Sequence, residues 1–536
     1  MFDFFKNRWV LITVLLIFAL FKIPNLLLPF YWDESSPYVP AVRQMYHNGL
    51  SLLPNALDAN LSRGHPLFLH FFFALWITIF GNSNFALHAC ALFISLLFLI
   101  TIYETGLRLF NQRVAVLALL LIATYVPFFV QSSFVLPEVL VAFLAFLSIG
   151  LYVKEKYLLS TLTLTALFFT KESGMIVGFV MGTDALIALF NSKTEIRKRL
   201  IRLLPVTIAG FFIGLFFIIQ KLLRGWYVFP FHTDSVLLKW DAIWDRFGTG
   251  VIHADFCMNS EYILFLALLV YSVIFLVKNK SIKNITPLSL AVLIVIAWFM
   301  ETSRIIRLDG KGSIYYIGTY LIFFTFIILY LRLLFFFAKK EFLASHVERR
   351  FVILIGLFIL CLSLFSSVLV FIPRYVLANG IAALFLLAVF FDILISHTSD
   401  KLYYPLIIVI MATAYLSFRG SNSWGDEEMG FTKGVKTQVA EVEFMEKNNF
   451  YDKHIYVNSY MGYTHLRDRD CGFLSSKKNF KYTGFDLMPN TDVVIWDNVE
   501  NFNASPGFLA NNPDFILIKK ISYDDKWAEI YCRKQK

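Results

Sequence analysis

The sequence predicts a polytopic α-helical membrane protein that ends in a small soluble α/β domain. Of its 536 residues, 58% are hydrophobic and only 16% are charged, which is too little polar surface for a water-soluble chain of this size. Long apolar segments recur as far as residue 418, and the composition then becomes polar. We therefore expect a transmembrane domain, 1–418, with a first outer loop at 31–83, and a soluble domain, 419–536.

Membrane-spanning helices need about 17–25 mostly apolar residues, and about thirteen segments qualify. The first follows Lys6 and Arg8 but lacks a small-residue cleavage site, so we expect it to remain as an uncleaved span. The segment from Pro66 to Phe80 is short and aromatic, as expected of a helix at the membrane interface. The expected spans are 9–30, 84–103, 113–130, 134–153, 157–170, 174–190, 203–222, 261–277, 286–300, 314–337, 351–372, 374–395 and 403–418.

The distribution of positive charge predicts the orientation of these spans. The formal net charge is +10, which in a soluble chain would suggest nucleic-acid binding. Here Lys and Arg gather in short loops on one side, for example at 154–156 and 197–202, so the positive-inside rule explains them and no nucleic-acid partner is expected. The loop 31–83 and the C-terminal domain then face outside, which in a bacterial inner membrane means the periplasm.

The C-terminal domain combines one helical pattern with several strand patterns. Phe431 to Asn448 has apolar residues at helical spacing. Strand-like runs follow at His454–Val457, Val493–Trp496, Phe515–Ile518 and Trp527–Tyr531, with turn residues between them. No phosphate-binding loop, metal cluster or nucleophile motif occurs in this domain. We expect it to cap the membrane cavity or to dock an acceptor.

The strongest chemical signal is the stretch from Tyr31 to Pro66. Asp33 and Glu34 lie where the first span ends, and carboxylates beside hydrocarbon are costly to keep charged, so they are usually functional. The structural interpretation is a helix cap or a solvated pair. The functional interpretation is a general base on the outer face, which accepts a proton from an attacking hydroxyl or amine. Spacing alone leaves both open.

Further motifs extend this signal along the chain. They are Arg43, Gly64-His65-Pro66-Leu67, Asn84 to His88, Leu136-Pro137-Glu138, Thr170 to Gly174 and Pro373-Arg374-Tyr375. Together with Asp33-Glu34, they resemble the glycosyltransferase C superfamily, nearest to the branch of protein O-mannosyltransferases and lipid A aminoarabinose transferases. The resemblance covers about residues 1–420. Leu67, Glu138 and the sequence from Arg63 to Pro66 depart from the usual family pattern, so the branch and the sugar are left open.

The resemblance implies an enzyme that moves a hexose or pentose from a polyprenyl-phosphate donor to a lipid, protein or glycan acceptor, with inversion. Asp33 matches the family's base, and Glu34 would hold a cation or a helix end. Lys171 and Arg374 fall at the outer ends of spans, where cations would stabilise the leaving phosphate. Arg63 is a third candidate. Each cation could instead be snorkelling to the interface.

Several other residues are expected to contact substrate. Glu138 and Glu172 could position the sugar or pair with Lys171, and Tyr375 belongs to the same motif as Arg374. His65 could bind substrate or, with a carboxylate, a divalent cation, so metal dependence is open and no cofactor is certain. His253 and Asp255 could enter the site from the loop 223–260, although a solvated loop is the simpler explanation.

A transporter or flippase for lipid-linked sugars, or a polysaccharide polymerase, is the alternative class. Such proteins also combine many spans with charged residues inside the membrane. Transporters often show internal repeats and helices that break near the midplane. This sequence has no convincing repeat, and its charges gather at the outer ends of spans. The sequence therefore favours the transferase.

Overall fold

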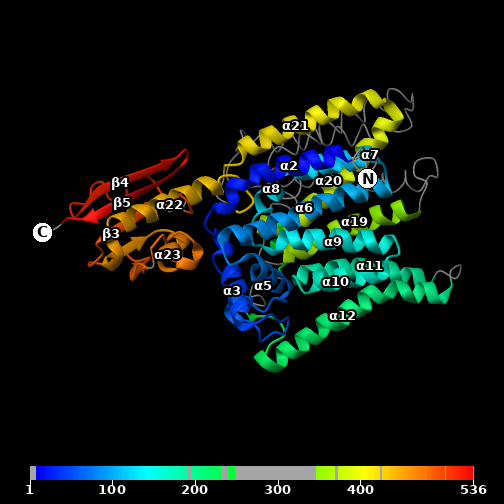
Figure 1. Ribbon diagram of the computed structural model, residues 1–536, viewed down its shortest axis with the longest axis horizontal. Helices are drawn as coiled ribbons and strands as arrows, with labels where there is room; N and C mark the ends of the chain where they lie inside the picture. Colours follow the sequence, from blue (N-terminus) through cyan, green and yellow to red (C-terminus); the bar gives the residue numbers. More distant parts are fainter. Residues whose placement is uncertain are drawn as a thin grey trace.

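The computed structural model consists of a helical unit and a smaller domain at one of its ends (Figure 1). It describes residues 8–190, 195–230, 236, 239–247, 251, 346–368, 372–422, 425–476, 478–500 and 503–534. The expected spans at 261–277, 286–300 and 314–337 lie outside these residues, as do His253 and Asp255. The number of spans therefore stays a prediction.

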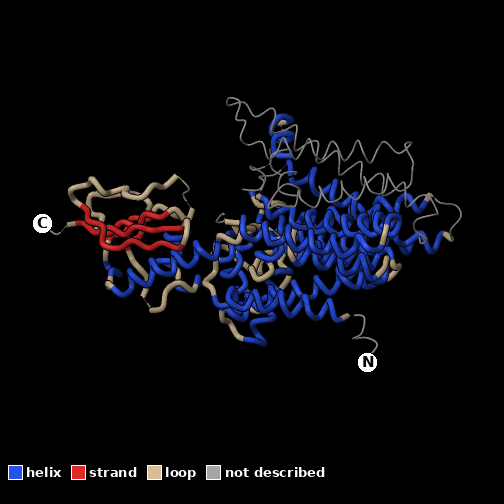
Figure 2. Tube along the Cα trace, turned by 90° about the horizontal axis from the view of Figure 1, so that it is seen from above, coloured by secondary structure: helices blue, strands red, loops and turns tan. Residues whose placement is uncertain are grey.

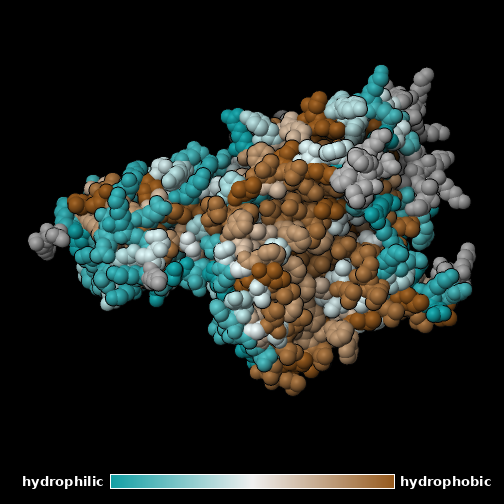
Figure 3. All heavy atoms as spheres, viewed as in Figure 1, coloured by the Kyte–Doolittle hydropathy of each residue, from teal (hydrophilic) through white to brown (hydrophobic). Residues whose placement is uncertain are grey.

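Within the described residues, seven helical segments are long and apolar enough to cross a membrane. They are α2 with η1 (Trp9–Leu27), α6 (Asn84–Leu109), η3 with α11 (Glu172–Leu189), α12 (Ile196–Arg224), α19 (His346–Val368), η5 with α20 (Pro373–Thr398) and η6 with α21 (Asp400–Gly420). Hydrophobic side chains cover the helical unit in Figure 3, whereas hydrophilic side chains cover most of the C-terminal domain. The chain is a multi-pass membrane protein, and the predicted fold class is confirmed.

Shorter segments complete the helical unit. The apolar ones are α5 (Phe68–Phe80), α7 (Gln112–Ala123), α9 (Pro137–Val153) and α10 (Tyr157–Phe168). The remaining ones are η2 (Trp32–Glu34), α3 (Tyr38–Asn48), α4 (Ala59–Ser62), α8 (Val126–Gln131) and α14 (Trp240–Asp245). The continuous span expected at 113–130 is wrong, because α7 ends before Thr124 and α8 begins anew. Pro127 lies in the first turn of α8 and, lacking an N–H, cannot continue a helix from α7.

Helix α20 forms the centre of the helical unit. Its most apolar stretch is entirely buried inside the protein. The helix packs against α7, α9 and α19. Neighbouring helices also approach closely, since a Cβ at Gly106 of α6 would lie 2.7 Å from the Cα of Ala115 in α7. A packed centre of this kind holds the ends of the helices, and the side chains on them, in fixed positions.

The C-terminal domain is built on one five-stranded sheet with the strand order β2-β1-β3-β5-β4, set apart from the helical unit in Figure 2. Strand β1 is parallel to β2 and β3, whereas β5 is antiparallel to β3 and β4. The strands are β1 (His454–Val457), β2 (Tyr482–Gly484), β3 (Val493–Asp497), β4 (Phe515–Tyr523) and β5 (Lys526–Arg533). Helices α22 (Phe431–Lys447) and α23 (Tyr460–Arg467) accompany the sheet. Four strands and α22 were predicted, whereas β2 and α23 were missed.

The C-terminal domain is attached to the loop that follows the first span. The backbone N–H of Phe30 donates to the carbonyl of Cys471 at 2.9 Å, and Arg43 donates to the carbonyl of Asp470 at 2.6 Å. The ring of Phe431, at the start of α22, packs edge-on against Phe134 with centroids 4.8 Å apart. These contacts fix the domain over the segment that contains Asp33. Cys471 does not use its thiol in a disulfide.

A buried acid makes the stability of this domain depend on pH. Glu500 accepts hydrogen bonds from the N–H groups of Tyr460 and Met461, but burial raises its pKa from 4.5 to about 7. A raised carboxyl pKa gives stability that is complete below pH 4.5 and is lost as the pH rises through 7. We therefore expect the stability of Glu500→Gln relative to wild type to rise by about 2 kcal/mol between pH 4.5 and pH 8, on top of a constant cost, because its amide nitrogen cannot accept one of the two N–H groups.

Hydrogen exchange of residues 454–533 in the full-length protein in detergent, measured at both pH values, checks this expectation. Asp452→Asn is the control, because Asp452 is exposed and pairs with Lys481 on the surface. A stability difference between wild type and Glu500→Gln that does not change with pH would contradict it.

Candidate active site

Asp33 and Glu34 lie in the single turn η2, and the turn gives them different surroundings. Glu34 is fully buried. One of its oxygens accepts from the N–H of Val135 at 2.7 Å and lies 3.2 Å from Nε2 of His88, while the other accepts from the N–H of Tyr31. Glu34 thus fixes η2 to the turn that precedes α9. Asp33 keeps a side chain that is 26% exposed and reaches a different partner.

That partner is Arg374, in the turn η5 (Pro373–Val376) between α19 and α20. Its side chain is only 1% exposed, yet it is surrounded by carboxylates. Nη2 donates to Asp33, Nη1 donates to Asp426, and Nε lies 3.6 Å from Oε1 of Glu138. A guanidinium is suited to this position because its fork of N–H groups can serve several carboxylates at once. The charge of this buried cation is therefore faced by three carboxylates, although its Nε makes no hydrogen bond within the described residues.

Lys171 joins the same cluster through Glu138. Lys171 lies between α10 and η3, and its Nζ donates to Oε1 of Glu138 at 2.9 Å. The ammonium also lies 4.1 Å from the centroid of the Tyr375 ring. Glu138 stands in the first turn of α9, where the helix dipole favours a negative charge. One carboxylate oxygen thus holds the two cations Lys171 and Arg374 beside each other.

Asp426 was not predicted from the sequence. It lies between α21 and α22, is 3% exposed, and contacts Arg374 from the C-terminal side of the last span. Burial and a hydrogen bond with Asp426 raise the pKa of its neighbour Glu427 well above its usual range. The acidic run from Asp426 to Glu428 directly after a span is the same kind of signal that singled out Asp33.

The other predicted residues lie around this cluster. Nδ1 of His65 lies 2.8 Å from Oε2 of Glu172, so Glu172 pairs with His65, whereas Lys171 pairs with Glu138. This pair ties the first outer loop to the turn that carries Lys171. Arg63 ends α4 in the left-handed conformation and forms no ion pair within the described part of the chain. Among the described residues, no group of three His, Cys, Asp or Glu side chains could hold a metal ion.

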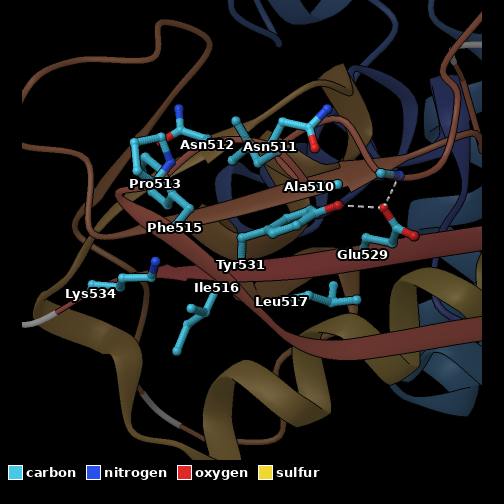
Figure 4. A pocket seen from close by; sticks show the side chains of 12 residues that line it. Ala510, Asn511, Asn512, Pro513, Phe515, Ile516, Leu517, Glu529, Tyr531 and Lys534 are labelled. Atoms are coloured by element: carbon cyan, nitrogen blue, oxygen red, sulfur yellow. Dashed lines mark hydrogen bonds between the residues drawn. The ribbon is translucent and has the colours of Figure 1, made fainter.

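A separate cavity lies in the C-terminal domain (Figure 4). It has a volume of about 620 Å³ and opens between β4, β5 and the loop that contains Asn511 and Asn512. Tyr531 and Glu529 line it, and the Tyr531 hydroxyl donates to Glu529 at 2.6 Å. Glu529 also accepts from the N–H of Gly507 and from Lys520. The carboxylate of Glu529 is thus paired with its neighbours, and none of the lining residues belongs to the cluster at Arg374.

Comparison with known proteins places the cluster in a wider context. Residues 64–219 match the family model described as dolichyl-phosphate-mannose-protein mannosyltransferase. The predicted resemblance to the glycosyltransferase C superfamily is confirmed. The matched segment contains His65, Glu138, Lys171 and Glu172. No curated protein matches the chain.

Solved structures give distant similarities. ArnT from Cupriavidus metallidurans, bound to undecaprenyl phosphate, shares 11% sequence identity over 98% of each chain, with a TM-score of 0.49. The archaeal oligosaccharyltransferase AglB from Archaeoglobus fulgidus, in complex with an inhibitory peptide and a dolichol-phosphate, shares 15% identity. That match covers 72% of this chain and 56% of AglB, with a TM-score of 0.30.

Proposed function

We propose that this protein is a membrane glycosyltransferase that moves a sugar from a polyprenyl-phosphate donor to an acceptor, with inversion at the anomeric carbon. The observation that carries the proposal is the contact of Asp33 with the buried cation Arg374, which Glu138 links to the half-buried Lys171, at the end of the helical unit that bears the C-terminal domain. The family model, named for a lipid-phosphate sugar donor, matches part of the same unit.

Each member of the cluster has a role in this reaction. When the acceptor attacks, negative charge grows on the leaving phosphate, and Arg374 and Lys171 would stabilise that charge more in the transition state than in the ground state. Asp33 would take the proton of the attacking hydroxyl or amine. Glu138 would keep the two cations at a fixed separation, because one of its oxygens faces both.

The remaining predicted residues are assigned to substrate positioning. The pair of His65 and Glu172 borders the turn of Lys171, so it would face the sugar or the acceptor. Tyr375 packs under the Lys171 ammonium and would limit where the phosphate binds. Glu34, which anchors η2 by three contacts, would hold Asp33 in place. The sugar would be a hexose or pentose, and the acceptor a lipid, protein or glycan.

We also propose a membrane and an orientation for this protein. The distribution of Lys and Arg in short loops favours an inner-membrane protein whose site and C-terminal domain lie on the periplasmic side. The transmembrane domain would comprise residues 1–418, and residues 419–536 would form a periplasmic domain that covers the site.

Sugar release from the lipid-linked donor separates this function from lipid transport. The purified protein in detergent is given polyprenyl-phosphate sugars and a nucleophilic acceptor, and the products are analysed by mass spectrometry and by the configuration of the new glycosidic bond. We expect cleavage of the sugar–phosphate bond and an inverted product. Translocation of the intact lipid-linked sugar across reconstituted vesicles, without bond cleavage, would refute the proposal.

A further inference from the structure

The segment that joins the last span to the C-terminal domain contributes a charged residue to the cluster. Asp426 and Asp33 each accept a hydrogen bond from one of the two terminal nitrogens of Arg374, although they are almost four hundred residues apart in the sequence. Both Asp426 and Arg374 are nearly inaccessible to solvent. The contact therefore belongs to the interior of the site, although Asp426 lies outside the helical unit.

A carboxylate at this position makes the contact that a phosphate would make. Carboxylate and phosphate oxygens both accept from the fork of a guanidinium with similar geometry. With both terminal nitrogens of Arg374 already holding carboxylates, a donor phosphate must share them or displace one partner. Asp33 lies in the turn η2, which its neighbour Glu34 anchors to Val135. Asp426 lies instead in the loop between α21 and α22. Asp426 is thus the partner that can yield.

The loop around Asp426 is attached to both units. The N–H of Met429 donates to the hydroxyl of Ser421 at 2.8 Å, which closes the loop on the end of α21. Phe431, five residues after Asp426, packs edge-on against Phe134 and lies 6.0 Å from the ring of Tyr31. A displacement of Asp426 would therefore be transmitted to the start of α22.

We infer that Asp426 is a positioning residue of this site, which holds Arg374 before the donor binds, competes with the donor phosphate for it, and moves with the segment 425–430 when the phosphate arrives. The inference rests on the proposed function. It assigns the C-terminal domain a part in donor binding that goes beyond covering the site.

The inference predicts that Asp426→Asn strengthens donor binding but lowers turnover. The amide removes one negative charge beside the phosphate position, so undecaprenyl phosphate should bind about tenfold more tightly. Arg374 is then held less firmly, so kcat should fall while KM for the donor also falls. A purely structural role of Asp426 would instead weaken donor binding. Asp426→Glu keeps the charge and should restore the wild-type affinity.

Binding of undecaprenyl phosphate to the full-length protein in nanodiscs tests this directly, together with hydrogen exchange of residues 421–431. In the wild-type protein, undecaprenyl phosphate should increase exchange in this loop, and undecaprenol without phosphate should not. Asp452→Asn, a surface carboxylate of the same domain that pairs with Lys481, is the matched control and should behave as wild type.

The outcomes separate the inference from the proposed function. If the wild-type protein binds undecaprenyl phosphate but Asp426→Asn binds it equally well or less well, the inference is overturned and the proposed function stands. Unchanged exchange of residues 421–431 on binding also overturns the inference. If the wild-type protein does not bind undecaprenyl phosphate at all, the proposed function fails and the inference fails with it.

Discussion

Replacing Asp33 by asparagine is expected to lower turnover by about 10²-fold or more, the lower end of what a positioned acid-base group contributes. The amide has the shape of the carboxylate and can still accept from Arg374, but it cannot take a proton from the acceptor. The loss should therefore appear in kcat, whereas donor affinity should not fall, because the amide also removes one negative charge beside Arg374. The measurement is the release of sugar from a polyprenyl-phosphate donor by the purified variant.

Asp58→Asn provides the matched control for this substitution. Asp58 lies in the same outer loop, where its side chain accepts from the N–H of Asn60 at the start of α4. Asparagine caps a helix as well as aspartate does, so both folding and turnover should be unchanged. Normal turnover by Asp33→Asn, with Asp58→Asn also active, would remove Asp33 from the mechanism.

The adjacent carboxylates show how far the sequence could define this site. The change from apolar to charged residues after the first span was sufficient to identify Asp33 and Glu34. The sequence could not assign the two carboxylates different roles, because the roles depend on which side chain faces Arg374 and which faces Val135 and His88. These partners come from the turn η5, the turn before α9 and helix α6, and the packing of these segments decides the question. The sequence suggested that Glu34 is catalytic or holds a helix end, and its contacts with Tyr31, Val135 and His88 lead us to propose the second role.

Asp426 shows a different limit. Lys171 and Arg374 could be proposed from their places at the ends of apolar spans, and the structure joins both to Glu138. Asp426 lies beyond the point where the composition turns polar, so it was counted with the soluble domain. Its position next to Arg374 follows from the path of the chain after α21, which neither periodicity nor composition encodes. Strand β2 was missed for a local reason, since three residues give no measurable alternation.

The largest expected effect on stability comes from Arg374. Arg374→Met removes the cation that faces Asp33, Asp426 and Glu138. Removing one partner of a buried ion pair typically costs about 3–5 kcal/mol, because a charge is left uncompensated. We expect the variant to lose activity and to unfold at a clearly lower temperature in detergent. Arg374→Lys should recover part of the stability but little activity, because an ammonium cannot reach both aspartates with a planar fork.

A double variant tests whether the lost stability is electrostatic. In Arg374→Met with Asp426→Asn, one of the uncompensated carboxylates is neutral, so the melting temperature should rise above that of Arg374→Met alone. Activity should stay absent, because the cation needed at the leaving phosphate is still missing. If the second substitution lowered the melting temperature further, the contact would contribute through packing and not through charge. In that case, Arg374 and Asp426 would stabilise the fold by packing, whereas the proposed reaction would still depend on charge, because only the charge of Arg374 can act on the phosphate.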